Sequence, residues 1–339
     1  MSVATGVGSM PGGEPLGSES DNARDYAEAV RLVLGELPDL PHLPELPGRG
    51  TAATMIGRAL AIVSELGADL QPAGWRLTDA PGVDQRRSRS LLAQDLDRLE
   101  EQAQGYDGAF KVQVAGPWTL AATVEKPRGD KVLSDVGARR ELAQALAEGL
   151  GDHVADARRR LRGVERLVVQ VDEPALPAVL AGSVPTASGF HRHRSVEPAE
   201  VSSALGWVFE SITGAGAEPW AHSCAGDTPL GLLRGAGARG LSVDLGLQSA
   251  ADHDALAEAL EAGDTVVLGV VDSVDPATAP EDGQVAEQVI RWLEMLGLDP
   301  HDLGDRLVLS PTCGLAGASY GWSRRALATL RDAATRLTP

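Results

Sequence analysis

The chain has 339 residues, of which 43% are hydrophobic, and its formal charge at neutral pH is −18. This length suits one large α/β barrel or two ordinary domains. Because an acidic chain is a poor partner for nucleic acid or an anionic membrane surface, we expect neither partner. No window approaches the roughly 20 apolar residues that a membrane-spanning helix needs. The first residues lack a basic start and an apolar core, so we expect no signal peptide and a cytoplasmic protein.

Short apolar runs alternate with longer helical stretches from end to end. Eight runs are predicted to be strands, at residues 3–8, 40–46, 110–115, 167–172, 219–222, 241–245, 265–271 and 306–310. Segments with 3.6-residue periodicity are predicted to be helices, at residues 22–37, 138–162, 198–213, 251–262, 284–296 and 324–337. Eight strands that alternate with helices predict a (β/α)8 barrel, which we take as one catalytic domain over residues 1–339.

Residues 47–109 are too numerous for a single helix between two strands. Their pattern predicts two helices, at residues 51–66 and 88–104. Between them, residues 74–78 are predicted to form part of a short hairpin over one barrel face. This segment is therefore expected to be an insertion in the barrel.

Metal-binding residue types gather at the ends of the predicted strands. His222 and Cys224 follow the fifth strand, Asp244 ends the sixth, and Cys313 follows the eighth. In a barrel these strand ends face one shared mouth, and residues two apart in extended chain point to the same side. One imidazole, two thiolates and one carboxylate form a zinc ligand set, so we expect the two sulfurs to lie within about 5 Å of each other.

Each of these residues taken alone also has a structural explanation. An isolated cysteine is commonly a small buried hydrophobe, an isolated histidine a satisfied core residue, and Asp244 a cap for the next turn. Their convergence favours zinc. Two thiolates and a carboxylate place about −3 against +2, and such an electron-rich ion suits alkyl transfer to sulfur better than activation of water.

Two adjacent acids, Asp172 and Glu173, end the fourth predicted strand before Pro174. The proline ends strand pairing and is expected to leave one carboxylate over the barrel axis. That carboxylate either binds the ammonium group of a substrate or pairs with an arginine of the barrel. The sequence leaves both alternatives open.

Several segments resemble, in the same order, motifs of the cobalamin-independent methionine synthase family. They are Gly8-Ser9-Met10-Pro11, Gln170-Val-Asp-Glu-Pro-Ala-Leu176, His222-Ser-Cys224, Gly269-Val-Val-Asp272 and Cys313-Gly-Leu315. The resemblance covers almost the whole chain and corresponds to the C-terminal catalytic barrel of the full-length enzyme, a barrel of the type also found in uroporphyrinogen decarboxylase.

The resemblance implies a zinc-dependent methyltransferase that converts homocysteine to methionine. By matching position, His222, Cys224 and Cys313 would be zinc ligands. The amino group of homocysteine would be held by Asp172, with Glu45 as a second acid in a weaker match. Ser9 would lie near the carboxylate of the substrate.

The chain departs from the family pattern in three places. Asp244 stands where the family usually has a glutamate zinc ligand. The family's Asp-x-His-Ser stretch, which supplies a proton-donating histidine, reads Asp272-Ser-Val-Asp275 here. We therefore expect Asp272 and Asp275 at the catalytic position, where Asp275 replaces the histidine or the methyl donor needs no proton. The folate-binding half of the long enzyme is not expected, so the donor is a methylcorrinoid (free or protein-bound) or methyltetrahydrofolate, and the missing histidine favours the corrinoid.

Three alternatives remain at this stage. The same zinc barrel can alkylate another thiol, such as a coenzyme M-like acceptor, whose sulfonate would need a basic pocket instead of Asp172. A metal-free decarboxylase of the uroporphyrinogen type would need arginines at the mouth. A non-catalytic zinc- or corrinoid-binding barrel would keep its metal closed by four protein ligands.

Overall fold

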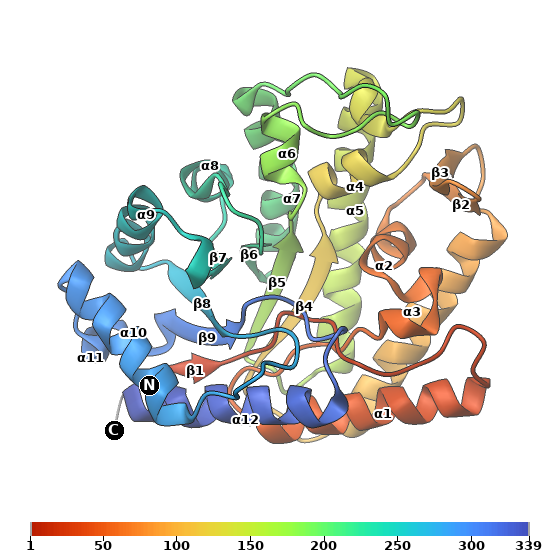
Figure 1. The fold of residues 1–339 in the computed structure, drawn as a ribbon. Helices are drawn as coiled ribbons and strands as arrows, with labels where there is room; N and C mark the ends of the chain where they lie inside the picture. Colours follow the sequence, from red (N-terminus) through yellow and green to blue (C-terminus); the bar gives the residue numbers. More distant parts are fainter. Residues whose placement is uncertain (1, 338–339) are drawn as a thin grey trace.

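The computed structural model of the chain describes residues 2–337. In it, helices surround a curled sheet of parallel strands (Figure 1). The strands are β1 Val3–Ala4, β2 Gly67–Gln71, β3 Gly74–Thr78, β4 Ala109–Ala115, β5 Arg166–Asp172, β6 Glu218–Ser223, β7 Gly240–Asp244, β8 Thr265–Val271 and β9 Leu307–Pro311. The α-helices are α1 Glu19–Glu36, α2 Met55–Ile62, α3 Val83–Gln102, α4 Pro117–Thr123, α5 Val136–Arg160, α6 Leu176–Leu180, α7 Pro198–Gly214, α8 Leu230–Ala236, α9 Ala250–Glu261, α10 Asp282–Leu296, α11 Pro300–Leu303 and α12 Tyr320–Leu337. Short 3-10 turns are η1 Pro47–Arg49, η2 Thr51–Ala53, η3 Val132–Ser134, η4 Leu245–Leu247 and η5 Gly304–Arg306.

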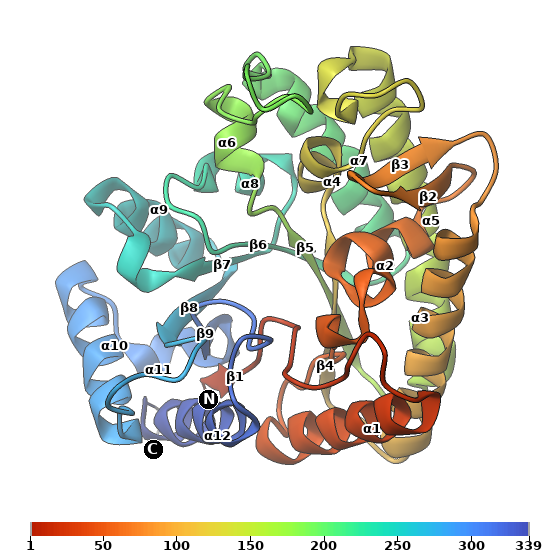
Figure 2. The same ribbon diagram turned by 45° about the vertical axis from the view of Figure 1, so that its right-hand side comes forward.

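The main sheet has the strand order β1-β9-β8-β7-β6-β5-β4, and each neighbouring pair is parallel. Figure 2 shows these strands curving round a common centre, with the helices on the outside. Parallel strands buried on both faces require nearly continuous apolar runs, as in Leu167-Val-Val-Gln-Val171 of β5. The predicted barrel architecture is confirmed.

The predicted strand at residues 40–46 is the exception, because it does not form a regular strand. It still bridges the two edges of the sheet: the Leu43 N–H donates to the Lys111 carbonyl at 2.8 Å, and the Glu45 N–H donates to the Gly8 carbonyl at 3.1 Å. Prolines at positions 41, 44 and 47 remove every third N–H from this segment. Without those donors a continuous ladder cannot form, so the barrel closes through isolated bridges.

Side chains that point into the barrel are arranged in layers. Because side chains alternate along a strand, every second residue faces inward. The layer nearest the amino-terminal ends of the strands is an apolar cluster of Leu40, Val168, Trp220, Val267 and Val308. The second layer lies one step closer to the carboxyl ends of the strands and also includes a residue of β4. Its buried side chains are polar: His42, Lys111, Gln170, His222 and Ser310. The barrel therefore has an apolar floor and becomes polar toward the carboxyl ends of its strands.

Between residues 40–46 and β4 the chain forms α2, the antiparallel hairpin β2–β3, and α3. Gln85 of α3, which is fully buried, joins these parts. Its side chain accepts from the Ala68 N–H at 2.9 Å and donates to the carbonyls of Leu60 and Leu66 at 2.9 and 3.0 Å. Across residues 2–337, no helix combines the length and apolar character needed to cross a membrane.

A close backbone contact fixes α5 against the end of α2. A Cβ added at Gly149, in the middle of α5, would overlap the carbonyl oxygen of Ile62. Two glycines of the same helix therefore offer a matched pair, because a Cβ at Gly151 would approach only the Ser211 hydroxyl, at an ordinary 3.5 Å.

We predict that Gly149→Ala destabilises the protein by roughly 1–3 kcal/mol, because overlap with a backbone carbonyl cannot be relieved by a side-chain rotation. Gly151→Ala is the control and should be neutral or stabilising by up to about 1 kcal/mol, as helix propensity alone dictates. Urea unfolding of the two variants measures both values. Equal stabilisation by the two substitutions would contradict the packing argument.

Candidate metal and substrate site

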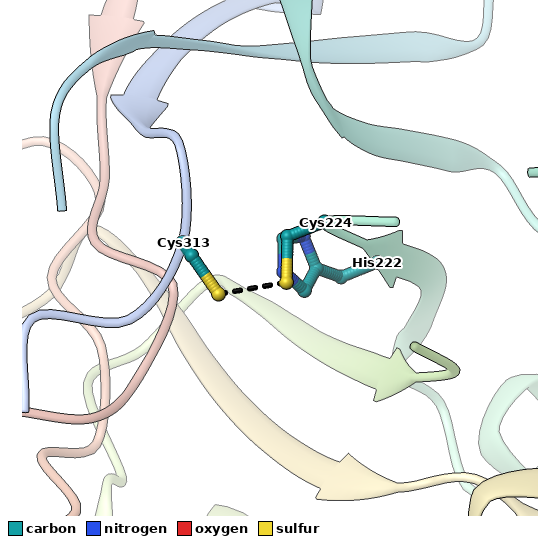
Figure 3. A group of neighbouring side chains, drawn as sticks. All are labelled: His222, Cys224 and Cys313. Atoms are coloured by element: carbon teal, nitrogen blue, oxygen red, sulfur yellow. Dashed lines mark hydrogen bonds between the residues drawn. The ribbon is translucent and has the colours of Figure 1, made fainter. Parts of the chain in front are cut away.

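Three predicted metal ligands meet at the carboxyl ends of β6 and β9. The ligand atoms of His222, Cys224 and Cys313 all lie within 4.8 Å of one another. The two sulfurs are 2.7 Å apart, and Figure 3 shows the thiols pointing toward one another with the imidazole beside Cys224. These three atoms are of the types that bind zinc and are grouped closely enough for one ion to lie among them.

The pKa values of the two thiols are shifted in opposite directions. The contact with the Cys224 sulfur, together with the adjacent His222, lowers the pKa of Cys313 to about 4. The same contact, together with burial, raises the pKa of Cys224. A lowered pKa favours the thiolate form of Cys313, which is the form that binds a metal ion.

The imidazole of His222 is oriented by its neighbour on β7. Its Nδ1 lies 2.9 Å from the Ser242 hydroxyl oxygen, whereas its Nε2 is buried and has no hydrogen-bond partner among the described residues. An unpaired buried ring nitrogen is costly, and a metal ion is one partner that removes the cost. The unpaired ring nitrogen and the two neighbouring thiols together fit a zinc ion.

Asp244, the fourth predicted ligand, lies close to this group but does not join it. Its Oδ1 accepts from the Gly246 N–H at 2.9 Å and so caps η4. Burial, with the negative charges of Cys313 and Asp272 nearby, raises the pKa of the Asp244 carboxyl. Its role as a metal ligand stays a prediction.

The two adjacent acids at the end of β5 have separate environments. Glu173 is fully buried and accepts from the N–H groups of Trp118 and Thr119 at 2.9 and 2.7 Å, so it caps α4. Asp172 faces the barrel interior, where its Oδ1 accepts from the Gln170 amide at 2.7 Å. Burial raises the pKa of each carboxyl to about 7. Of the two acids, Asp172 is the one that lines a pocket.

Glu45 approaches the same pocket from the proline-rich segment. Its Oε1 accepts from the Gln113 amide at 3.0 Å and lies 3.2 Å from Nε of Arg58. Arg58 in turn pairs with Asp95 at 2.6 Å, and Arg49 binds the same carboxylate through two hydrogen bonds of 2.7 and 2.8 Å. This buried chain of charges connects Glu45 to the inserted helix α3.

Ser9 lies where the first and last barrel segments meet. Its carbonyl accepts from the Leu315 N–H at 2.8 Å. A Cβ at Gly314 would overlap the Ser9 hydroxyl, so a larger residue there would force the Ser9 side chain to turn away from the loop that carries Cys313.

A cavity of about 230 Å³ joins these groups. Its wall combines acids, thiols and an imidazole with apolar side chains such as Met55 and Pro174. The predicted site residues that line it are Ser9, Glu45, Asp172, His222, Cys224 and Cys313. Six residues from distant parts of the sequence therefore share one pocket at the carboxyl ends of the strands.

Asp272 and Asp275 do not line this cavity. The carbonyl of Asp272 accepts from the Trp322 indole at 3.0 Å. The carboxylate of Asp275 accepts from the hydroxyl and the N–H of Ser319 at 2.5 and 2.7 Å, which lowers its pKa. Both roles in catalysis stay predictions.

Sequence reasoning did not single out Gln113 and Lys111 of β4, or give Gln170 of β5 a role of its own. Both strands carry a signal: polar residues at every second position interrupt otherwise apolar runs, in Phe110-Lys-Val-Gln-Val114 and in the β5 run. Inward-facing polar residues in a buried strand require partners inside the barrel.

The chain is similar to known proteins both in sequence and in fold. The family described as "Cobalamin-independent synthase, Catalytic domain" matches residues 111–336, about two thirds of the chain. The chain belongs to this methionine synthase family. No curated protein sequence matches it significantly.

Among solved structures, a B12-independent methionine synthase from Shewanella sp. W3-18-1, in complex with selenomethionine, aligns with a TM-score of 0.65 at 16% identity. The alignment covers 98% of this chain and 97% of that one, and it supports the barrel fold. The Streptomyces cattleya GH5_18 structure, at 13% identity over 98% of this chain and 79% of that one, has a TM-score of 0.46, too low for any inference. As a member of the methionine synthase family, the chain is a methyltransferase of methionine biosynthesis.

The buried acid Glu173 has a consequence for stability. Since its pKa is about 7 in the folded protein and 4.5 as its ordinary value, the native state holds a proton that the unfolded chain has lost between these pH values. The free energy of unfolding should therefore fall as the pH rises from about 4.5 to 7, by up to about 3 kcal/mol from this group.

We predict that Glu173→Gln flattens this pH dependence, measured by urea unfolding from pH 5 to 8. Glu165→Gln, at an exposed position directly before β5, is the control and should leave the slope unchanged. An identical slope in Glu173→Gln and the natural chain would refute the assignment.

Proposed function

We propose that the chain is a zinc-dependent methyltransferase that transfers a methyl group to the thiol of homocysteine and so forms methionine. The observation that carries this proposal is the presence, in one small cavity, of a His-Cys-Cys group and two carboxylates. The first set suits a thiol-binding metal, and the second suits an ammonium group. A thiol-bearing amino acid unites both requirements.

His222, Cys224 and Cys313 would hold the zinc, with Asp244 as the expected fourth ligand. Bound there, zinc would supply a positive centre that favours the thiolate form of the acceptor at neutral pH. Ser242 would keep the His222 ring oriented, because it occupies the other ring nitrogen.

Asp172 and Glu45 would bind the amino group of homocysteine. Each has one oxygen anchored by a glutamine of the barrel wall, Gln170 for Asp172 and Gln113 for Glu45. The related Shewanella structure contains selenomethionine, an amino acid of the product type, which supports the same substrate class here. Against a coenzyme M-like acceptor, the nearby cations Arg58 and Lys111 are already engaged by protein groups.

In the reaction, the acceptor thiol loses its proton, the sulfur forms a bond to the methyl carbon, and the bond from that carbon to the donor breaks. A folate leaving group needs a proton, whereas a corrinoid leaving group does not. Asp275 is a poor proton donor, because its hydrogen bonds to Ser319 lower its pKa. Val274 is exposed where the family has its histidine. These features favour a methylcorrinoid, free or protein-bound, over methyltetrahydrofolate.

We predict that Cys313→Ser and His222→Ala each remove most of the bound zinc and nearly all methyl transfer, since each loses one of three clustered ligands. His301→Ala changes an exposed histidine of α11 and is the matched control. Zinc per chain by elemental analysis and methionine formation are the two readouts. Full zinc and full activity in either site variant would refute the ligand assignment.

Methionine formation from homocysteine, with methylcobalamin and methyltetrahydrofolate offered in separate reactions, tests acceptor and donor. We expect product with methylcobalamin and little or none with the folate. Zinc-edge absorption should show a third sulfur when homocysteine is added to a site that has Cys224 and Cys313. No added sulfur would indicate a closed structural site instead.

A further inference from the structure

A buried lysine lies inside the barrel beside the proposed amino-group site. Lys111 of β4 is fully buried, and its Nζ donates to the Val7 carbonyl and to Oε1 of Gln170, each at 2.8 Å. Lysine is seldom fully buried unless its polar end is paired, and here both pairs lie within the polar layer of the barrel.

Gln170 connects this lysine to Asp172. Its Nε2 donates to Oδ1 of Asp172 at 2.7 Å and to the Val7 carbonyl at 2.9 Å. The lysine donor must face the amide oxygen, so the amide NH2 must face the carboxylate. Reversing the amide would place NH2 against the lysine and oxygen against the carboxylate, which are two unfavourable contacts. Lys111 and the Val7 carbonyl together therefore determine which way Gln170 points.

The orientation of Gln170 in turn determines how Asp172 is presented. Its Oδ1 is anchored, while its Oδ2 accepts no hydrogen bond from residues 2–337 and Asp172 lines the cavity. One oxygen is therefore held by the wall and the other remains for a ligand.

We propose that Lys111 is a positioning residue, which acts through Gln170 to hold the Asp172 carboxylate in the orientation that receives the amino group of the acceptor. This inference rests on the proposed function. Burial lowers the pKa of Lys111 to about 7, against the opposing effect of Asp172 and Glu45. The arrangement survives loss of that proton, because a neutral amine keeps the two N–H groups that Val7 and Gln170 require.

A purely structural role for Lys111 is the competing explanation, since it also ties β4 to the segment after β1. The two roles differ in what they do to a ligand without an amino group. We therefore compare homocysteine with 4-mercaptobutyrate, the same thiol acid without its ammonium, as acceptors for the full chain carrying zinc.

In Lys111→Met, which keeps the length but removes the donors, we expect the KM for homocysteine to rise about tenfold or more with little change in kcat. The KM for 4-mercaptobutyrate should not change. Gln170→Leu should give the same pattern, and the double variant should lose no more than either single one, because both act through Asp172. Equal losses with both acceptors would establish the structural role, and no loss with either would also overturn the inference.

Crystal structures of the two variants without substrate test the geometry independently of activity. We expect the Asp172 carboxylate to turn away from its present position in each. An unmoved carboxylate overturns the inference even if methyl transfer is confirmed. If Lys111→Met does not fold, Gln170→Leu carries both tests. If the natural chain neither binds nor methylates homocysteine, the proposed function fails first, and Lys111 is then a structural residue.

Discussion

The alternation of side chains along parallel strands is the constraint on which the whole site depends. Every second residue of a barrel strand must face the interior, whatever its chemistry. On β5 that rule places Val168, Gln170 and Asp172 in successive layers, from apolar floor to pocket. On β6 it places Trp220 below His222. A metal-binding group can form at the mouth because the layers beneath it are already filled.

The polar layer inside the barrel, which contains Lys111 and Gln170, shows how a barrel of small aliphatic residues tolerates so many buried polar groups. The charge in this layer has partners, since Lys111 donates to a carbonyl and to an amide oxygen, and the buried Arg58 of α2 beside it has two carboxylates. An unpaired charge in such surroundings would cost several kcal/mol. The glutamines are suited to this layer because each offers both a donor and an acceptor. Gln170 connects the Lys111 amine to the Asp172 carboxylate, and Gln113 donates to Glu45.

The sequence contained most of the architecture, since strand and helix periods are local properties. It also placed His222, Cys224 and Cys313 together, because strand ends in a parallel barrel share one mouth. The residue pattern alone did not separate Asp172 from Glu173, and only the family resemblance pointed to Asp172, since the difference depends on α4 presenting free N–H groups to Glu173. Nor could it foresee the contact of Asp275 with Ser319, 44 positions away, which no local pattern encodes. For residues 40–46 the apolar content suggested a strand, but the prolines decided the hydrogen bonding.

The proline-interrupted segment that closes the barrel has one further consequence. Glu45 belongs to this sparsely bonded seam, whereas Asp172 belongs to a fully paired strand on the far side of β4. An amino acid whose ammonium group binds both carboxylates would connect these two segments of the barrel wall. Occupancy would then reduce the exchange of the amide hydrogens of residues 40–46 with solvent.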